Sequence, residues 1–250
     1  MSEWAGRTAV VTGGGRGFGK AFGTALAGLG AHAVLVDIDG AVAADAAAQI
    51  RAEGGSAEGL AGDVTNEARM AEVMAQAAMA NGGIDLLINN AGLHSDEYGQ
   101  PIITMGLAKV RRLFEVNVIG TVCCTLAAHP HMKGRARASV INISSSAGHM
   151  GGSAYGDSKL AVAGLTITFA RELAPDGIRV NAISPGMILT ETIKAELPPE
   201  TKARVKAMQL LQTDGEERHI VDAMLFLVSD RAGFITGETL RVTGGMAAGV

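Results

Sequence analysis

Residues 10–21 read Val10-Val11-Thr12-Gly13-Gly14-Gly15-Arg16-Gly17-Phe18-Gly19-Lys20-Ala21, a short apolar run that ends in a glycine-rich turn. Turns of this kind bind phosphate groups, because glycine allows positive φ angles and a close approach of the backbone to a ligand. The spacing Gly14-x-x-x-x-Gly19-Lys20 approaches a nucleoside triphosphate loop, which needs Ser or Thr at the next position. That position is Ala21, whose methyl group cannot bind magnesium. The turn therefore has to be interpreted together with the rest of the chain.

The composition indicates a globular protein of one domain. Of the 250 residues 48% are hydrophobic and 18% are charged, and the net charge is −4. This length suits a single domain, which we assign to residues 1–250. A mildly acidic chain gives no electrostatic reason to expect nucleic acid or an anionic membrane as a partner. No apolar run approaches the roughly 20 residues of a membrane span, and residues 1–9 do not resemble a signal peptide. We therefore expect a cytoplasmic protein.

The cysteines and histidines indicate neither a disulfide nor a metal site. Cys123 and Cys124 are the only cysteines, and neighbouring residues rarely pair, so we expect buried thiols in a reducing compartment. The six histidines form no H-E-x-x-H motif and no cluster with cysteine, so no metal is expected.

Short apolar runs alternate with longer helical patterns along the chain. Strands are expected at 7–12, 32–37, 58–61, 84–89, 139–143, 178–183 and 239–242, and helices at 17–29, 41–53, 67–80, 105–128, 153–173 and 216–228. Connections of ten or more residues require parallel strands, and unbroken apolar runs such as Ala33-Val34-Leu35-Val36 are typical of strands buried on both faces. The pattern predicts a doubly wound, Rossmann-type α/β domain: a parallel sheet of about seven strands with helices on both faces. The irregular segment 187–215 is expected to form a helical substrate flap.

Asp37 distinguishes the two kinds of phosphate site. It ends the second predicted strand, 20 residues after Gly17, where an acid can accept hydrogen bonds from an adenosine ribose. A triphosphate loop requires no such acid, so a dinucleotide is favoured. A carboxylate would also repel a 2′-phosphate, which favours NAD over NADP, although Arg16 could weaken that preference. The alternative is that Asp37 caps the next turn and Arg16 is solvated.

Five short motifs occur in order on the expected elements. They are Thr12-Gly13-x-x-x-Gly17-x-Gly19; Asn89-Asn90-Ala91-Gly92; Asn117 within Phe-Glu-Val-Asn-Val; Ile143-Ser144-Ser145 followed by Tyr155-x-x-x-Lys159; and Asn181-Ala-Ile-Ser-Pro185-Gly186. With them the chain resembles the short-chain dehydrogenase/reductase family, from Arg7 to Gly245. The resemblance implies an NAD(H)-dependent oxidoreductase that interconverts a small secondary alcohol and its ketone, with NADP less favoured. It also implies a homo-tetramer built on the apolar faces of the helices at 105–128 and 153–173.

Tyr155 and Lys159 have a chemical interpretation of their own. They are four residues apart on a predicted helix, so their side chains share one face. A free tyrosine has a pKa of about 10, and an ammonium about 4–6 Å away favours the phenolate. Tyr155 could then act as general acid or base while hydride moves to or from the cofactor. Ser145 would hydrogen-bond the substrate oxygen as charge develops on it.

The resemblance assigns further roles to the catalytic group. Lys159 would also hold the nicotinamide ribose, and Asn117 would position a water that relays protons. Ser145 lies ten residues before Tyr155, whereas the family usually has about thirteen, so the intervening loop is short. Ser144 and Ser146 are the alternatives to Ser145.

The resemblance also implies a cofactor site. Its expected residues are Gly13, Arg16, Gly17, Phe18, Gly19, Asp37, Asp63, Val64, Asn90, Ala91, Gly92, Tyr155, Lys159, Pro185, Gly186, Ile188 and Thr190. The Asp63-Val64 pair would meet the adenine, and Thr190 the carboxamide of nicotinamide.

Two loop histidines, His94 and His149, are the substrate-site candidates together with Met150, because they follow the carboxyl ends of strands. The alternative is that both are ordinary loop residues. The pocket is expected to be formed by residues 93–98, 149–153 and 187–211. These segments are largely apolar or neutral, which favours small cyclic, hydroaromatic, terpenoid or steroid-like alcohols over polyanions.

Other functions fit the sequence less well than a dehydrogenase. A non-catalytic dinucleotide sensor or scaffold is the main alternative, because a fold alone does not give a function. The presence of all four expected catalytic side chains favours the enzyme. By resemblance, sugar epimerases of this fold need a longer carboxyl-terminal domain, and 2-enoyl reductases usually space tyrosine and lysine more widely.

Overall fold

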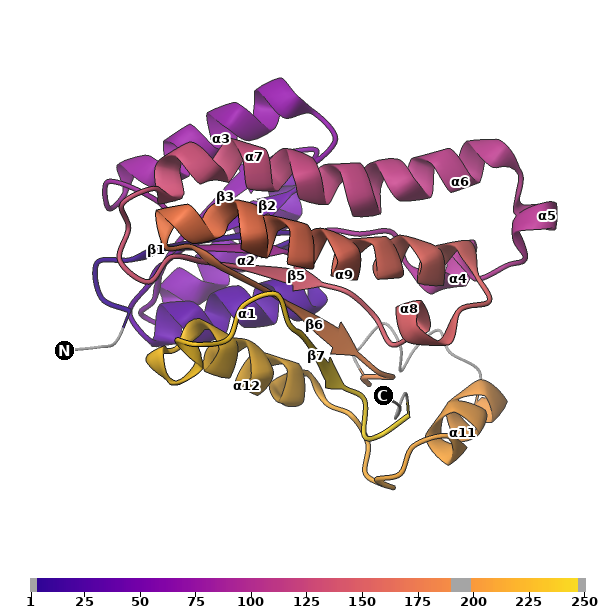
Figure 1. Ribbon diagram of the computed structural model, residues 1–250. Helices are drawn as coiled ribbons and strands as arrows, with labels where there is room; N and C mark the ends of the chain where they lie inside the picture. The colour runs from indigo at the N-terminus through magenta and orange to yellow at the C-terminus, as the bar shows by residue number, and fades with distance from the viewer. Residues whose placement is uncertain (1–3, 190–198, 247–250) are drawn as a thin grey trace.

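The computed structural model describes residues 4–189 and 199–246, and their strands form one parallel sheet (Figure 1). The sheet has seven strands in the order β3-β2-β1-β4-β5-β6-β7. They are β1 (Thr8–Thr12), β2 (His32–Asp37), β3 (Ser56–Ala61), β4 (Leu86–Asn89), β5 (Ser139–Ile143), β6 (Arg179–Pro185) and β7 (Thr239–Val242). The predicted doubly wound α/β fold is confirmed, and most strand bounds differ from the prediction by no more than two residues.

Helices cover both faces of the sheet. The longer ones are α1 (Gly17–Gly28), α2 (Gly40–Ala52), α3 (Glu67–Met79), α6 (Leu107–Phe114), α7 (Gly120–Met132), α9 (Ala154–Leu173), α11 (Pro199–Ala207) and α12 (Glu217–Val228). Short helices are α4 (Ser95–Tyr98), α5 (Ile102–Met105) and α8 (Ala147–Met150). Helices α3, α7 and α9 lie over one face, and α1, α2 and α12 over the other. Helix α11 falls within the segment predicted as a flap, and residues 190–198 of that segment lie outside the described part.

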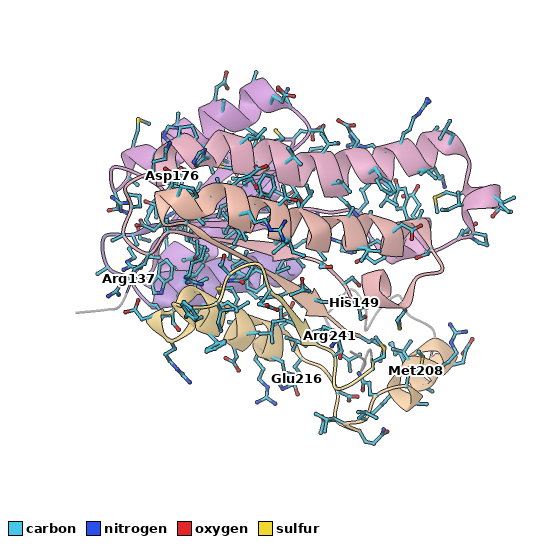
Figure 2. The ribbon with its side chains drawn as sticks, viewed as in Figure 1. Arg137, His149, Asp176, Met208, Glu216 and Arg241 are labelled. Atoms are coloured by element: carbon cyan, nitrogen blue, oxygen red, sulfur yellow. The ribbon has the colours of Figure 1, made fainter. Side chains whose placement is uncertain are left out.

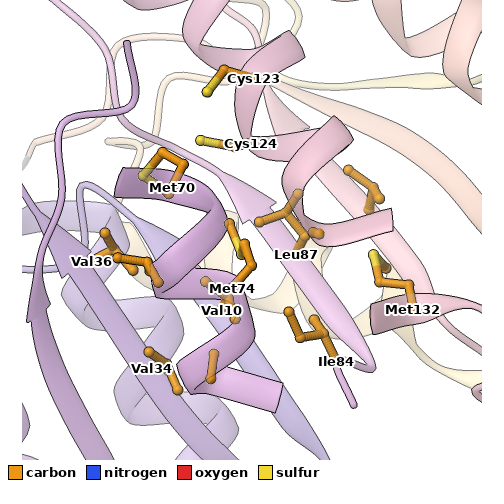
Figure 3. Packing of buried hydrophobic residues seen from close by; sticks show 14 of the residues in the cluster. Val10, Val34, Val36, Met70, Met74, Ile84, Leu87, Cys123, Cys124 and Met132 are labelled. Atoms are coloured by element: carbon orange, nitrogen blue, oxygen red, sulfur yellow. The ribbon is translucent and has the colours of Figure 1, made fainter. Parts of the chain in front are cut away.

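Two apolar cores, one on each face, hold the layers together. Because side chains alternate along a strand, Val10 and Val34 contact one core, while Val11 and Leu35 contact the other. Figure 3 shows the first core, where strand valines meet side chains of α3 and α7: Met70, Met74, Cys123, Cys124 and Met132. Both cysteines are free and buried, as predicted, and burial raises the pKa of both thiols. Each strand of the sheet centre is therefore packed on both faces, which explains the unbroken apolar runs.

A π-helical turn interrupts the helix predicted at 105–128. The helix begins at Leu107, widens into a π turn at Glu115–Ile119, and continues as α7 to Met132. Pro130 lies inside α7, so the proline does not end the helix. A π turn contains one residue more than the backbone pattern of an α-helix accommodates, and such turns are frequent at functional sites. Asn117 occupies this turn.

The helical run Leu107–Met132 is long and apolar. Among the described residues, Leu107–Met132 is long and apolar enough by length and composition to cross a membrane, and half of its most apolar stretch is buried within the fold. The sequence analysis predicts no such segment. Helices that line a protein core pass the same test, so the finding is weak evidence for a membrane span.

Candidate functional site

The glycine turn lies where the strand order reverses. Strand β1 is flanked by β2 and β4, so the loops that follow β1 and β4 meet at the carboxyl edge of the sheet. This edge is where ligands bind in doubly wound folds. Helix α1 begins at Gly17, and Arg16 before it is exposed and provides no side-chain cap. The first N–H groups of α1 therefore receive no side-chain acceptor from the cap position, an arrangement suited to an anion.

Gly17 and Gly19 of this turn require glycine for different reasons. Gly17 has a φ of +49°, a conformation that side-chain-bearing residues rarely adopt. A Cβ on Gly19 would lie 2.0 Å from the carbonyl oxygen of Gly13, which no side chain can tolerate. The backbones of Gly13 and Gly19 thus pack directly against each other, whereas the space around Gly17 is open.

The loop after β4 is bonded directly to the glycine turn. The Thr12 hydroxyl accepts hydrogen bonds from the N–H groups of Asn90 and Ala91, each at 3.1 Å. The Asn90 side-chain amide donates to the carbonyl oxygens of Thr12 and Gly13, both at 3.0 Å. Asn90, predicted as a cofactor residue, is therefore placed to hold the phosphate turn in shape.

Asp37 lies against the same turn. Its carboxylate is only 8% exposed and accepts hydrogen bonds from the N–H groups of Gly15, at 3.1 Å, and Asp39, at 3.2 Å. A Cβ on Gly15 would come within 2.9 Å of the carboxylate, so the contact requires glycine. Each carboxylate oxygen has a second lone pair, which leaves acceptor capacity for ribose hydroxyls.

The loop after β3 contributes Asp63 and Val64. The Asp63 carboxylate accepts hydrogen bonds from the N–H and hydroxyl groups of Thr65, at 2.9 and 2.8 Å. Burial alone would raise the pKa of Asp63, but these hydrogen bonds and the charge of Arg112 together lower it. Val64 is buried, and its side chain lies close to Gly120.

Taken together, the donors and acceptors at this edge fit a dinucleotide. The uncapped N–H groups of α1 and the open surface at Gly17 suit a pyrophosphate. Asp37 and Asp63 provide carboxylates at successive strand ends, where an adenosine would lie. The residues present therefore fit the cofactor class that the sequence predicts.

Tyr155, Lys159 and Ser145 come together at the ends of β5 and α9. The Lys159 side chain is 5% exposed, and its ammonium donates to the carbonyl oxygen of Ile143 at 2.9 Å. The same ammonium lies 5.9 Å from the centre of the Tyr155 ring. The hydroxyl groups of Ser145 and Tyr155 are hydrogen-bonded. The spacing of four residues on α9 thus produces the shared face that the sequence predicts.

Burial dominates the titration of this group. It lowers the pKa of Lys159 to about 8 and raises the pKa of Tyr155, which the Ser145 hydrogen bond lowers only in part. The sequence analysis expects the ammonium to make the phenol more acidic. In the structure, loss of solvent is the largest effect on the phenol and raises its pKa, so Tyr155 is protonated at neutral pH.

The three consecutive serines have different surroundings. The hydroxyl of Ser144 is buried and donates to the backbone carbonyl oxygen of Lys159 at 2.8 Å. This bond holds the backbone from which the Lys159 side chain extends. The N–H of Ser146 donates to the carbonyl oxygen of Pro185 at 2.9 Å. Ser145 is the serine whose hydroxyl meets Tyr155, so the geometry favours it over the two alternatives.

Asn117 connects the loop after β4 to α9. Asn117 is 1% exposed. Its side-chain oxygen Oδ1 accepts a hydrogen bond from the N–H of Leu93 at 2.8 Å, and its side-chain nitrogen Nδ2 donates to the Ser158 hydroxyl at 3.1 Å. Ser158 in turn donates to the carbonyl oxygen of Tyr155 at 2.7 Å. A Cβ on Gly92 would lie 3.2 Å from the Asn117 side chain and 3.3 Å from the Lys159 ammonium. The Asn117 side chain is thus held by Leu93 and Ser158, and its role in positioning a water stays a prediction.

Two polar residues of the site were not assigned a role from the sequence. Thr12 and Ser158 lie inside the quoted motifs. The Thr12 hydroxyl joins the end of β1 to the loop after β4, and the Ser158 hydroxyl joins α9 to the π turn. The sequence feature that could have identified Ser158 is its position, three residues after Tyr155 and directly before Lys159. Hydroxyl groups at such places commonly bond nearby backbone groups.

The remaining predicted residues are spread along the carboxyl edge. Gly186 donates its N–H to the carbonyl oxygen of Val242 at 2.9 Å, and Ile188 is buried beside Gly215. Phe18 is partly buried, with its ring 6.3 Å from that of Phe22. Thr190 lies outside the described residues. Across the described ranges, no group of three or more His, Cys, Asp or Glu side chains could hold a metal ion.

The three substrate-site candidates are all exposed. His94 precedes α4 without a capping hydrogen bond, and His149 and Met150 end α8. Figure 2 labels His149 on α8 and Arg241 on β7, both at the carboxyl edge of the sheet. Burial and the positive charge of Arg241 lower the pKa of His149. Arg241 was not predicted as a site residue.

Comparisons with known proteins give one consistent family. A family model described as enoyl-(acyl carrier protein) reductase matches residues 13–247. A probable short-chain type dehydrogenase/reductase of Bradyrhizobium diazoefficiens is 37% identical over all of this chain and 90% of its own length. Cis-4-hydroxycyclohexanecarboxylate dehydrogenase of Sinomonas cyclohexanicum is 36% identical over 97% of both chains. The structure of a putative D-mannonate oxidoreductase from Haemophilus influenza, with bound NAD, superposes with a TM-score of 0.92 at 25% identity, covering 98% of this chain and 96% of that one.

Proposed function

The chain belongs to the short-chain dehydrogenase/reductase family, and on that premise we propose that it interconverts a secondary alcohol and its ketone with NAD(H), Tyr155 moving the proton. Family membership makes the protein an oxidoreductase. The observation that carries the proposal is the pairing of the Tyr155 and Ser145 hydroxyl groups, with the Lys159 ammonium 5.9 Å from the tyrosine ring. A sensor or scaffold has no use for three such groups at one point.

The side chains divide the acid–base work between them. A bound nicotinamide supplies the hydride or accepts it. Tyr155 is protonated at neutral pH, so it can donate its proton to a ketone oxygen at once. In the other direction Tyr155 must first lose its proton to become a phenolate, which the ammonium of Lys159 stabilises, and the phenolate then accepts the alcohol proton. Ser145 holds the substrate oxygen beside the phenol, and Asn117 and Ser158 hold the backbone of Tyr155 in place.

We propose NAD rather than NADP on the position of Asp37. Its buried carboxylate lies beside Gly15, where an adenosine ribose would be bound by the turn. A negative charge at this point repels a 2′-phosphate. Arg16, the cation that could weaken this repulsion, is exposed. The related D-mannonate oxidoreductase structure contains NAD, which supports the proposal.

The proposed substrate is a small molecule, and relatives point to its chemistry. One relative is named for 4-hydroxycyclohexanecarboxylate and another for D-mannonate. Near Tyr155 the wall is apolar, formed by Leu93, Tyr98 and Ala154. A compact alcohol with an apolar portion suits this wall.

The protein is proposed to be a cytoplasmic homo-tetramer. Helices α7 and α9 carry exposed apolar side chains, among them Leu126 and Leu160, which supports a homo-tetramer formed through these faces. Light scattering that gives the mass of a monomer would contradict it. The cytoplasm is proposed as the location from composition alone.

Reduction of a carbon–carbon double bond is the second candidate, because the matching family model is described as an enoyl reductase. The hydrogen bond between Ser145 and Tyr155 favours the alcohol, since two adjacent hydroxyl groups suit the single oxygen of an alcohol or ketone. Both reactions are tested together, with a panel of secondary alcohols and a 2-enoyl thioester, each with NAD(H) and NADP(H). The readout is the absorbance of the reduced cofactor.

The matched variants are Tyr155→Phe and Tyr98→Phe, because these are the two tyrosines of the chain and both belong to one cluster. Tyr155→Phe should lower alcohol turnover by about 10²–10⁴-fold, the usual contribution of a general acid–base, and leave cofactor affinity nearly unchanged. Tyr98→Phe should retain turnover. Full activity of Tyr155→Phe would refute the mechanism. Cofactor binding without turnover of any alcohol by the unmodified protein would favour the sensor.

A further inference from the structure

Helix α8 places His149 close to the catalytic serine. The N–H of Gly148 donates to the carbonyl oxygen of Ser145, and the N–H of His149 to that of Ser146, both at 3.0 Å. The chain from 145 to 149 is therefore one helical turn, and residues one turn apart lie about 5–6 Å from each other at Cβ. Only nine residues connect Ser145 and Tyr155, and His149, which lies among them, is exposed at this end of the site.

The end of β7 brings Arg241 to the same corner. Ser146 is bonded to Pro185, and Pro185 pairs with Val242 across β6 and β7. Val242 packs against the core beneath α1 and α12, so Arg241, the preceding residue, points to the opposite face. That face carries α9, and α8 packs on α9 through Gly148. The charge of Arg241 acts on His149, which agrees with this placement (Figure 2).

The other side of the site has a different character. Tyr155 packs with the apolar cluster of Leu93, Tyr98, Met105 and Ala154. Two exposed carboxylates of nearby elements are already in ion pairs, Glu97 with Lys109 and Glu216 with Arg218. Tyr155 thus has apolar neighbours, whereas the end of α8 that follows Ser145 lies within the field of the Arg241 charge.

We propose that Arg241 and His149 bind a carboxylate of the substrate, so that the substrate class is a hydroxy acid with an apolar body. This deepens the proposed function and rests on it for the alcohol end of the molecule. Arg241 also interacts elsewhere in the chain, but a guanidinium has five N–H donors and can serve more than one partner. Arg241 and His149 act as specificity residues, because neither takes part in moving the proton or the hydride.

Binding of a ligand that cannot react tests the proposal. Cyclohexanecarboxylate and cyclohexanecarboxamide have the same apolar body and differ in charge. Titration calorimetry with saturating NADH, and separately NADPH, should give about tenfold tighter binding of the carboxylate, as expected for hydrogen bonds to a charged group. Arg241→Gln should abolish this preference and His149→Gln reduce it. Arg218→Gln, an exposed arginine of α12, should leave it unchanged.

Equal affinities for the two ligands overturn the proposal, as does no detectable binding of the carboxylate or a preference that survives Arg241→Gln. The measurement does not depend on turnover, so it separates the two levels of inference. A carboxylate preference in a protein that oxidises no alcohol would refute the proposed function alone. Turnover of neutral alcohols without a carboxylate preference would refute the substrate class alone.

Discussion

The buried ammonium of Lys159 predicts an unusual dependence of stability on pH. Burial lowers its pKa from 10.5 to about 8. The unfolded chain therefore binds this proton more tightly than the folded chain, so the charged side chain destabilises the fold fully below pH 8. The penalty fades as pH rises through the window between about 8 and 10.5. A difference of about 2.5 pKa units corresponds to roughly 3 kcal/mol at pH 7.

Lys159→Met removes the charge while retaining a long, unbranched side chain. It also removes the hydrogen bond to Ile143, which offsets about 1–2 kcal/mol of the gain. We expect the variant to be inactive, yet about 1–2 kcal/mol more stable than the unmodified protein at pH 7. By pH 9 most of the native ammonium has lost its proton, and the advantage should fall by about 1 kcal/mol. Tyr155 does not interfere, because its raised pKa keeps it neutral over this range.

Urea unfolding followed by circular dichroism at pH 7 and pH 9 measures the two differences. Lys109→Met is the control, since Lys109 is 53% exposed in a surface ion pair, and its substitution should give the same small change at both values. A stability difference between Lys159→Met and the unmodified protein that is identical at pH 7 and pH 9 would refute the assignment of a depressed pKa to Lys159.

Three further outcomes are expected. Asp37→Ala should narrow the preference for NAD over NADP by at least about tenfold in kcat/KM, because a like charge opposite the 2′-phosphate is removed; an unchanged ratio contradicts the role of Asp37. Gly19→Ala should weaken NADH binding, measured by fluorescence, by more than about tenfold because its Cβ meets the Gly13 carbonyl, whereas Gly28→Ala on the same helix has open space and should bind normally. Asp85→Ala should lower the free energy of unfolding by about 3–5 kcal/mol, because it leaves Arg135 and the N–H of Thr8 without their buried partner. Glu72→Ala, which breaks a surface pair, should cost less than about 1 kcal/mol, and similar losses for both would refute that reasoning.

The fold was predictable because its determinants are local. Strands buried on both faces favour unbroken apolar runs, as in β2, and the predicted bounds of β2, β5 and β7 coincide with the observed ones. The glycine turn and Asp37 follow successive strands, so their meeting at one edge follows from the topology. The shared face of Tyr155 and Lys159 follows from helical spacing alone.

Features that depend on distant contacts could not be predicted. Helical periodicity gives no sign of the π turn at Asn117, which is held by Leu93 and Ser158 from other elements. The protonated state of Tyr155 depends on burial by neighbouring elements, which sequence spacing does not reveal. Likewise, Arg241 approaches His149 from a strand 92 residues further along the chain, so no local motif links them.

The π turn places opposing demands on one continuous helix. Each residue of an α-helix advances the rotation by about 100°, so a deletion between Glu115 and Ile119 would restore ordinary helical hydrogen bonding at the cost of turning α7 by that angle relative to α6. Such a rotation would carry Cys124, Ala128 and Met132 away from the core. The extra residue therefore sets the rotation of α7 relative to α6 about the helix axis. With it, Asn117 is positioned at the reaction centre while the buried face of α7 packs on the sheet.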